Sequence, residues 1–224
     1  MNMAKSTAKK IFIVDDHPVY RDGLVSLVKR EADLAVCGEA GNAPEALAAI
    51  ESSKPDLVLA DIGLPGNSGL ELVKDLRAAR PEMAVLVISM HDETLYAERV
   101  LRAGGRGYVM KQAGPEKILQ AIRQVLDGQI AVSGKMSARI LDALSDRRAK
   151  TNSPIARLTD REFEILQLIG RGKDSHAIAG QLHLSVKTVD AHRGNLKEKL
   201  ELKSGTELIC YAARWMEKHS PANT

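Results

Sequence analysis

Five short apolar runs alternate with amphipathic stretches through roughly the first 130 residues of this 224-residue chain. The runs are KIFIVD, LAVCGEA, DLVLAD, AVLVIS and GYVM. Runs that are apolar throughout, rather than alternating with polar residues, indicate strands buried on both faces of a parallel sheet. The stretches between them, at 18–30, 43–52, 68–80, 93–103 and 115–127, have the period of helices. The sequence therefore predicts an α/β domain, with a doubly wound five-stranded parallel sheet, that ends near residue 130.

After that point the pattern changes to helices alone. Residues 136–145 predict a connecting helix, and the stretch DRRAKTNSPIAR has the charged, proline-containing composition of a linker. Four short helices are expected at 160–170, 175–182, 185–200 and about 206–218, with the capping boxes TDRE and SGTE at the starts of the first and the last. We predict a first domain over 1–132, a linker with a helix over 133–157, and an all-α four-helix domain over 158–220.

Composition narrows the classes of protein that fit. The chain has no apolar run near the ~20 residues that a membrane span needs, and its first residues, MNMAKSTAKK, carry no signal-peptide pattern. We therefore expect a cytoplasmic protein with no membrane partner. Cys37 and Cys210 lie far apart and are expected to be reduced thiols. The net charge is +3, and residues 133–157 hold six basic against two acidic residues, which hints at an acidic partner for the later part of the chain.

Three aspartates follow predicted strands. Asp15 and Asp16 end the first run, and Asp61 ends the third. In an open parallel α/β sheet, ligands bind outside the carboxyl ends of the strands, near the point where the strand order reverses. Three carboxylates that converge there repel one another unless a cation lies among them, and such oxygen ligands suit Mg2+. The alternative is that each aspartate only caps the loop or helix that follows it.

The fourth and fifth predicted strands also end in polar residues. Ser89 ends VLVIS, and Lys111 ends GYVMK. Alone, each is an ordinary strand-end or surface residue. Together with the aspartates, they supply a hydroxyl and a fixed ammonium for phosphoryl transfer, which needs positioning and charge neutralisation more than covalent chemistry from the protein. The sequence thus predicts a phosphoryl-handling site with Mg2+ as its cofactor.

The motifs VDDHP, DIGLPG, VISMH and GYVMK make residues 9–128 resemble the receiver domain of two-component response regulators. The resemblance implies a flavodoxin-like fold in which Asp61 accepts a phosphoryl group from the phosphohistidine of a sensor histidine kinase. It implies that Asp16 binds Mg2+ directly, as does Asp61, that Asp15 acts through water, and that the backbone carbonyl of Gly63 completes the site.

Three further roles are implied by the same resemblance. Lys111 would pair with the phosphoryl group, Ser89 would hydrogen-bond to it, and Tyr108 would be the switch aromatic that turns inward when Ser89 moves. The alternative for Tyr108 is a plain strand residue that fills a gap. The sequence departs from many receivers after the lysine, where KQAGP replaces the usual proline.

Residues 158–220 resemble the helix-turn-helix domain of LuxR/NarL-type regulators, through LTDREFEILQLIGRGKDSHAIAGQL and LSVKTVDAHRGNLKEKL. In a helix-turn-helix the second helix enters the major groove, so residues 185–200 would form the recognition helix. Val189, Leu196 and Leu200 are spaced to face the core. The residues expected to contact DNA are Lys187, Thr188, Asp190, Ala191, His192, Arg193, Gly194 and Lys197, with Lys199 as a further phosphate contact. The alternative is a solvated basic face.

Within that set, two kinds of contact are expected. Lys187, Thr188, His192 and the later lysines suit phosphates, whereas Asp190, Ala191, Arg193 and Gly194 occupy positions that could face base edges. Arg193 is the natural guanine reader, because a guanidinium bonds O6 and N7 together. The apolar stripe of the last helix either pairs two DNA-binding domains or packs on its own core.

The sequence therefore predicts a bacterial response regulator, not an enzyme, in which phosphorylation of Asp61 controls homodimerisation and sequence-specific binding to double-stranded DNA. A sensor histidine kinase is the expected partner, and RNA polymerase is a further candidate. Three other classes stay open. A haloacid-dehalogenase-type phosphatase has Asp-x-Asp-x-Thr after the first strand, and DDHPV lacks the second Asp at that spacing. The others are a regulator that is never phosphorylated and one switched by a small signal molecule.

Overall fold

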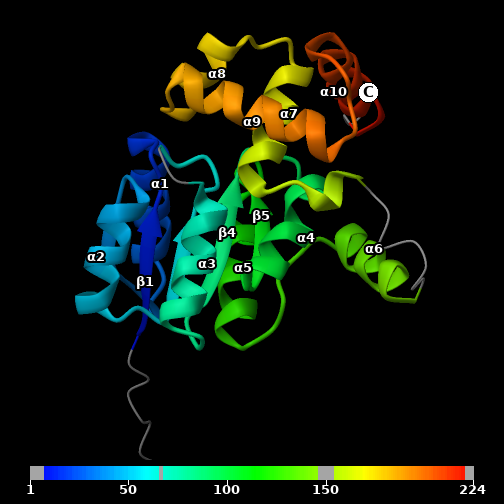
Figure 1. The fold of residues 1–224 in the computed structure, drawn as a ribbon. Helices are drawn as coiled ribbons and strands as arrows, with labels where there is room; N and C mark the ends of the chain where they lie inside the picture. Colours follow the sequence, from blue (N-terminus) through cyan, green and yellow to red (C-terminus); the bar gives the residue numbers. More distant parts are fainter. Residues whose placement is uncertain (1–7, 66–67, 146–153, 220–224) are drawn as a thin grey trace, which may run out of the picture. The chain divides into compact units, whose positions relative to one another are not determined.

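The computed structural model describes residues 8–65, 68–145 and 154–219 (Figure 1). The chain divides into two compact units, residues 1–141 and 142–224. In the part of the chain that the structure describes, no helix is both long and apolar enough to cross a membrane.

The first unit is built on five parallel strands in the order β2-β1-β3-β4-β5, which confirms the predicted doubly wound sheet. The strands are β1 (Lys9–Val14), β2 (Leu34–Ala40), β3 (Leu57–Ala60), β4 (Ala84–Ser89) and β5 (Gly107–Met110). The order reverses between β1 and β3. The carboxyl ends of these two strands therefore border the crevice in which such sheets bind ligands.

Helices cover both faces of this sheet (Figure 1). They are α1 (Pro18–Lys29), α2 (Ala43–Ser53), α3 (Gly69–Ala79), α4 (Glu93–Ala103) and α5 (Pro115–Leu126). On one face, Val28 of α1 and Ile122 of α5 pack against Ile11 and Ile13 of β1 in a common core. The helices α2, α3 and α4 pack side by side and cover the other face. The continuous apolar strands follow from this burial on both faces.

Local signals place the helix starts within one or two residues of the predicted positions. Asn42 caps α2, because its side chain accepts a hydrogen bond from the backbone N–H of Glu45. Prolines occupy the first turns of α1, α2 and α5, where a missing N–H costs nothing. The helix α6 (Gly134–Ser145) follows α5 and contains the predicted connecting helix.

The second unit is helical, as predicted. A short 3-10 helix (Pro154–Arg157) precedes α7 (Asp160–Gly170), α8 (Ser175–Leu182), α9 (Val186–Lys199) and α10 (Gly205–His219). The helix α7 packs against α9 and α10, and α8 packs against α9. The core includes Phe163 of α7, Val189 and Leu196 of α9, and Leu208 of α10, all buried.

The two predicted capping boxes differ in detail. At α7 both halves form, between Thr159 and Glu162. At α10 the hydroxyl of Ser204 accepts from the N–H of Glu207, but the Glu207 carboxylate accepts from the backbone N–H of Lys203, one residue earlier than a capping box requires.

Candidate phosphoacceptor site and DNA-binding helix

Asp61 follows β3 at the reversal point of the sheet, and its position is fixed by its backbone. Its N–H donates to the carbonyl of Val14 at 2.9 Å, which continues the pairing of β3 with β1. The start of α3 lies directly against this turn. A Cβ atom added at Gly69 would come within 1.9 Å of the Asp61 carbonyl oxygen. Only glycine lets α3 approach the strand end this closely.

Two groups hold the Asp61 carboxylate, which is 4% exposed. The Lys111 Nζ lies 2.6 Å from its Oδ2, and the backbone N–H of Gly63 donates to its Oδ1 at 3.2 Å. The same ammonium lies 2.7 Å from the Oδ2 of Asp15. The structure therefore brings the ends of β1, β3 and β5 together around one lysine.

The buried charged groups shift one another's pKa values. Burial disfavours the charged form of Lys111, but the nearby carboxylates of Asp61 and Asp15 outweigh it and raise the pKa of Lys111 above its usual value. Burial also raises the pKa of Asp15, and hydrogen bonds from Lys111 and His17 oppose that rise. The ammonium is thus firmly charged where a phosphoryl group would need a counter-charge.

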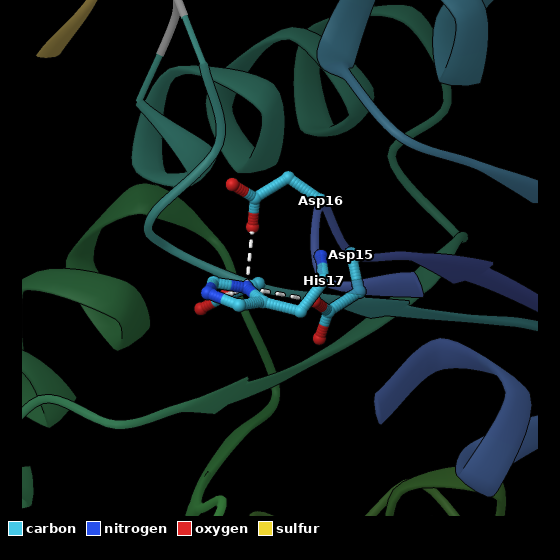
Figure 2. A group of neighbouring side chains, drawn as sticks. Asp15, Asp16 and His17 are labelled. Carbon is cyan, nitrogen blue, oxygen red and sulfur yellow. Dashed lines mark hydrogen bonds and ion pairs between the residues drawn. The ribbon is translucent and has the colours of Figure 1, made fainter. Parts of the chain in front are cut away.

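Asp16 and His17 form the open side of the cluster. Figure 2 shows the imidazole of His17 turned back toward the carboxylates, with its Nδ1 2.7 Å from the Oδ1 of Asp16 and 3.4 Å from the Oδ1 of Asp15. Carboxylate or imidazole atoms of Asp15, Asp16, His17 and Asp61 lie within 4.8 Å of one another. The Asp16 Oδ1 atom is shielded from solvent and accepts no hydrogen bond of good geometry from the described residues.

This donor set fits a hard divalent cation. Three carboxylates converge, and one ammonium compensates only part of their charge. Among the described residues, the Asp16 carboxylate pairs with the imidazole of His17 and not with the ammonium of Lys111. Mg2+ prefers such oxygen ligands and keeps several waters. The acidic pocket expected from the sequence is therefore present, and receiver domains bind Mg2+ at such a pocket.

Ser89 and Tyr108 lie on the next strands along the sheet, and both are buried. The Ser89 Oγ is 3.1 Å from the Nδ1 of His91. The Tyr108 hydroxyl donates to the carbonyl of His91 at 2.8 Å, so the ring points inward. Burial raises the pKa of Tyr108 well above its ordinary value, and the phenol therefore stays protonated and able to donate.

The predicted DNA-contacting residues lie on α9. Its apolar side chains Val189 and Leu196 are buried, as expected, and Leu200 closes the helix. Of the remaining residues, some are exposed (Lys187, Thr188, Asp190, Ala191 and Gly194) and some are half-buried (His192, Arg193 and Lys197). The structure thus presents one polar face of α9 to solvent, over the positions predicted from the sequence.

Three of the predicted contacts also have partners within the domain. The carboxylate of Asp190 accepts from the hydroxyl of Ser175 at 2.8 Å, which ties α9 to the start of α8. The Thr188 hydroxyl lies 2.8 Å from that of Ser185, the cap of α9. Lys199, expected at a phosphate, pairs with the buried Glu162 at 2.7 Å. A phosphate there would have to share this ammonium.

Sequence reasoning missed two neighbours of Asp61. His17 joins the carboxylate cluster, and the motif DDHP contained the signal for it. Tyr20 places its ring 4.7 Å below the Lys111 ammonium, and burial followed by the charges of Asp15 and Asp61 raises the pKa of Tyr20 to about 12. No local pattern indicated this contact, because it joins the first turn of α1 to the end of β5.

Comparison with known proteins agrees with this architecture. Residues 11–123 match the response regulator receiver domain, and residues 156–212 match the luxR family of bacterial regulatory proteins. Oxygen regulatory protein NreC of Staphylococcus haemolyticus is 36% identical over 210 residues, which cover 92% of this chain and 97% of that protein. NreC of Staphylococcus aureus (strain MRSA252) is 37% identical with the same coverage.

Solved structures show the same folds. A LuxR-family two-component response regulator from Aurantimonas sp. SI85-9A1 is 33% identical, covers 62% of this chain and 100% of its own, and has a TM-score of 0.58. The RcsB response regulator of Salmonella typhimurium is 23% identical, with coverages of 93% and 98% and a TM-score of 0.64. At that identity the likeness to RcsB shows the fold.

The fold and the site define a response regulator, in which a receiver domain is joined to a LuxR-type DNA-binding domain. Within this class the chain belongs to the NarL/FixJ family, of which NreC is a member, and the family consists of transcription regulators rather than enzymes. A receiver domain also implies a histidine kinase as partner.

Proposed function

We propose that a sensor histidine kinase phosphorylates Asp61 in a Mg2+-dependent reaction, and that this modification controls the pairing of two chains and sequence-specific binding of α9 to DNA. The observation that carries the proposal is the setting of the Asp61 carboxylate. It is almost buried at the reversal point of the sheet, yet it has a fixed ammonium at 2.6 Å and two further carboxylates beside it.

The chain's own groups orient the nucleophile. Lys111 and the N–H of Gly63 hold the two oxygens of Asp61 in separate directions, so that one oxygen can attack phosphorus while the ammonium compensates the charge of the incoming group. Burial of the carboxylate keeps bulk water from the same position. These are the requirements of phosphoryl transfer to an aspartate.

The cation would be held by Asp15, Asp16, Asp61 and the backbone carbonyl of Gly63. When bound, Mg2+ supplies positive charge to the carboxylates and to the phosphoryl oxygens. Ser89 and Tyr108 would then change their hydrogen bonds on modification, since Ser89 ends β4, Tyr108 lies within the neighbouring strand β5, and both are buried in hydrogen-bonded positions.

The helical domain would read DNA as a pair. Residues 158–224 carry ten basic and nine acidic residues, so the attraction of one copy to phosphates is weak. Two copies on half-sites about one helical turn apart would add their contacts. RcsB has been solved bound to the promoter rprA in the presence of the phosphomimetic BeF3-, and as two dimers bound to two parallel DNAs. We extend this binding of DNA by a pair of chains to the present protein.

The domain limits that go with this proposal are 1–132 for the receiver, 133–157 for the linker and 158–220 for the DNA-binding domain. We place the protein in the cytoplasm, where a sensor kinase and DNA are both within reach. RNA polymerase is a further partner that a transcription regulator of this kind would contact.

Phosphorylation by a small phosphodonor tests the proposal directly. Incubation with acetyl phosphate and Mg2+ should add one phosphoryl group to the wild type, measured by intact mass, and none to Asp61→Asn. Asp16→Ala should instead raise the Mg2+ concentration needed, because it removes a cation donor and leaves the nucleophile. Equal incorporation in the wild type and Asp61→Asn would refute the assignment, and catalytic turnover of a small phosphate ester would favour a phosphatase.

Gel filtration with and without beryllofluoride then reports the pairing of chains.

A further inference from the structure

His91, in the loop between β4 and α4, contacts both buried residues that follow the phosphoacceptor. The Ser89 Oγ lies 3.1 Å from the Nδ1 of His91 and accepts from its backbone N–H at 3.4 Å. The Tyr108 hydroxyl donates to the carbonyl of His91 at 2.8 Å. Ser89 is 0% and Tyr108 1% exposed, so these hydrogen bonds form away from water and are costly to leave unmade.

The position of the imidazole is set by packing as well as by Ser89. The ring of His91 meets the ring of Tyr96 edge to face, with centroids 4.8 Å apart and planes at 75°. Tyr96 lies in α4 and is 1% exposed. The Nδ1 atom is therefore held at the Ser89 hydroxyl by a rigid neighbour.

The hydroxyl of Ser89 has a single proton to donate. Because the backbone N–H of His91 can only donate, it uses a lone pair of the Ser89 oxygen. The Ser89 proton is left for one of two acceptors beside it, the Nδ1 atom of His91 and the phenol oxygen of Tyr108. The Nδ1 atom accepts that proton when the imidazole carries its own on Nε2. A phosphoryl group on Asp61 has only acceptor oxygens and would need the same proton from Ser89.

We propose that His91 is a positioning residue that competes with the phosphoryl group for the Ser89 hydroxyl, and so sets how readily the receiver takes up phosphate. This inference rests on the proposed function, because it requires Ser89 to bond to a group on Asp61. In the phosphorylated protein the Ser89 proton turns to the phosphoryl oxygen, and the bond to Nδ1 is lost. The backbone bond from Tyr108 to the same loop does not depend on the His91 side chain.

Two substitutions separate the hydrogen bond from the packing. His91→Phe keeps a ring edge against Tyr96 but has no nitrogen, whereas His91→Asn keeps a polar atom near the position of Nδ1 but has no ring. The binding of beryllofluoride to the full chain with Mg2+, measured by calorimetry, reports the affinity for the phosphoryl-like group. We expect His91→Phe to bind about two- to tenfold more tightly than the wild type, the factor that one neutral hydrogen bond contributes, and His91→Asn to stay near the wild type.

A double-mutant cycle makes the test specific to Ser89. In a Ser89→Ala background the competition no longer exists, so His91→Phe should leave the affinity unchanged. Equal or weaker binding by His91→Phe in the otherwise wild-type protein would overturn the proposal, as would a tightening that persists without the Ser89 hydroxyl. If the wild type and Asp61→Asn bind beryllofluoride alike, both this inference and the proposed function fail. If only the wild type binds and His91→Phe matches it, this inference alone fails.

Discussion

The ammonium of Lys111 bridges the carboxylates of Asp61 and Asp15, at 2.6 and 2.7 Å, with the Lys111 and Asp61 side chains 3% and 4% exposed. Buried like charges are tolerated only when an opposite charge lies between them. The lysine therefore has a structural task before any phosphoryl group arrives.

The first prediction follows from this bridge. Lys111→Ala should lower the free energy of unfolding of the receiver by about 3 kcal/mol in the absence of divalent cations, because it removes the ammonium between two buried carboxylates. Added Mg2+ should restore part of the loss, since the cation takes over the missing charge. Hydrogen exchange of the β1 and β3 amides, followed by mass spectrometry with and without Mg2+, measures both effects. Equal protection in Lys111→Ala and wild type without Mg2+ would show that the bridge contributes nothing.

The second prediction concerns the close approach of α3 to Asp61. Gly69→Ala should destabilise the receiver by about 1–3 kcal/mol and slow acetyl phosphate labelling, because its Cβ would overlap the Asp61 carbonyl. Gly23→Ala is the matched control, since Gly23 lies inside α1 with no heavy atom within 4 Å of an added Cβ. That change should leave labelling unaltered and stabilise the helix slightly. Unchanged labelling in both variants would contradict the argument.

The third prediction concerns pH and the helical domain. Burial acts to raise the pKa of Glu162, but bonds from Lys199 and Thr159 outweigh it, so the pKa of Glu162 is lowered from 4.5. A carboxyl with a lowered folded-state pKa stabilises the fold above its unfolded value and loses that contribution as the pH falls through the folded value. The domain should therefore become less stable below about pH 4.5, and Glu162→Gln should remove this part of the pH dependence.

The single tryptophan makes that measurement specific. Trp215 lies in α10 with its ring 5.4 Å from that of Phe163 in α7, so its fluorescence during urea titration of the full chain reports the helical domain. Titrations of the wild type and Glu162→Gln at pH 7, 5 and 3.5 give the comparison. The same decline in both proteins between pH 5 and 3.5 would rule out Glu162 as the titrating group.

The fourth prediction concerns α9 and DNA. Arg193→Ala should cost about 1–3 kcal/mol on an operator and relax the preference at one base pair, because a guanidinium reads guanine by two hydrogen bonds. Lys197→Ala should weaken binding to all DNA about equally and reduce the salt slope by about one counterion. Titrations against operator and random DNA at two salt concentrations distinguish the two roles.

A matched control removes one positive charge away from α9. Lys218 is exposed on α10, and Lys218→Ala should change the affinity for both DNAs less than Lys197→Ala does. If Arg193→Ala loses the same affinity on operator and random DNA, Arg193 is a phosphate contact. Full-affinity binding by a strict monomer would reject the paired mode of recognition.

The sequence predicted the elements well, for a physical reason. Strands buried on both faces are apolar throughout, as in β3 and β4, and such runs are visible without a structure. The ends of β3, β4 and β5 also marked Asp61, Ser89 and Lys111, because a parallel sheet brings its carboxyl ends to one edge. The pattern of apolar residues along the chain therefore predicts which strand a residue belongs to and whether it lies at the end of that strand.

The pattern of apolar residues could not predict the direction in which each side chain points. The bond between Ser89 and His91 depends on a rotamer within a short loop, and the ring of Tyr20 meets Lys111 across ninety-one positions of sequence. The pairing of Lys199 with Glu162 likewise joins α9 to α7. Each contact depends on how helices and strands pack in three dimensions, and a repeat pattern carries no such information.

The shared lysine has a consequence for how the modification can be sensed. Three carboxylates and one ammonium leave the cluster with a formal charge of about −2, bound Mg2+ brings this to about zero, and a phosphoryl group carrying about two negative charges replaces the single charge of Asp61. The modified, metal-loaded cluster therefore differs from the empty one by only about one unit. Outside the protein, the field of a change this small is screened over about 10 Å at ordinary salt. The electric field of the receiver is almost the same in the empty state and in the metal-loaded, modified state. A distant helix must therefore detect the modification through direct contacts, by way of side chains that change their hydrogen-bond partners.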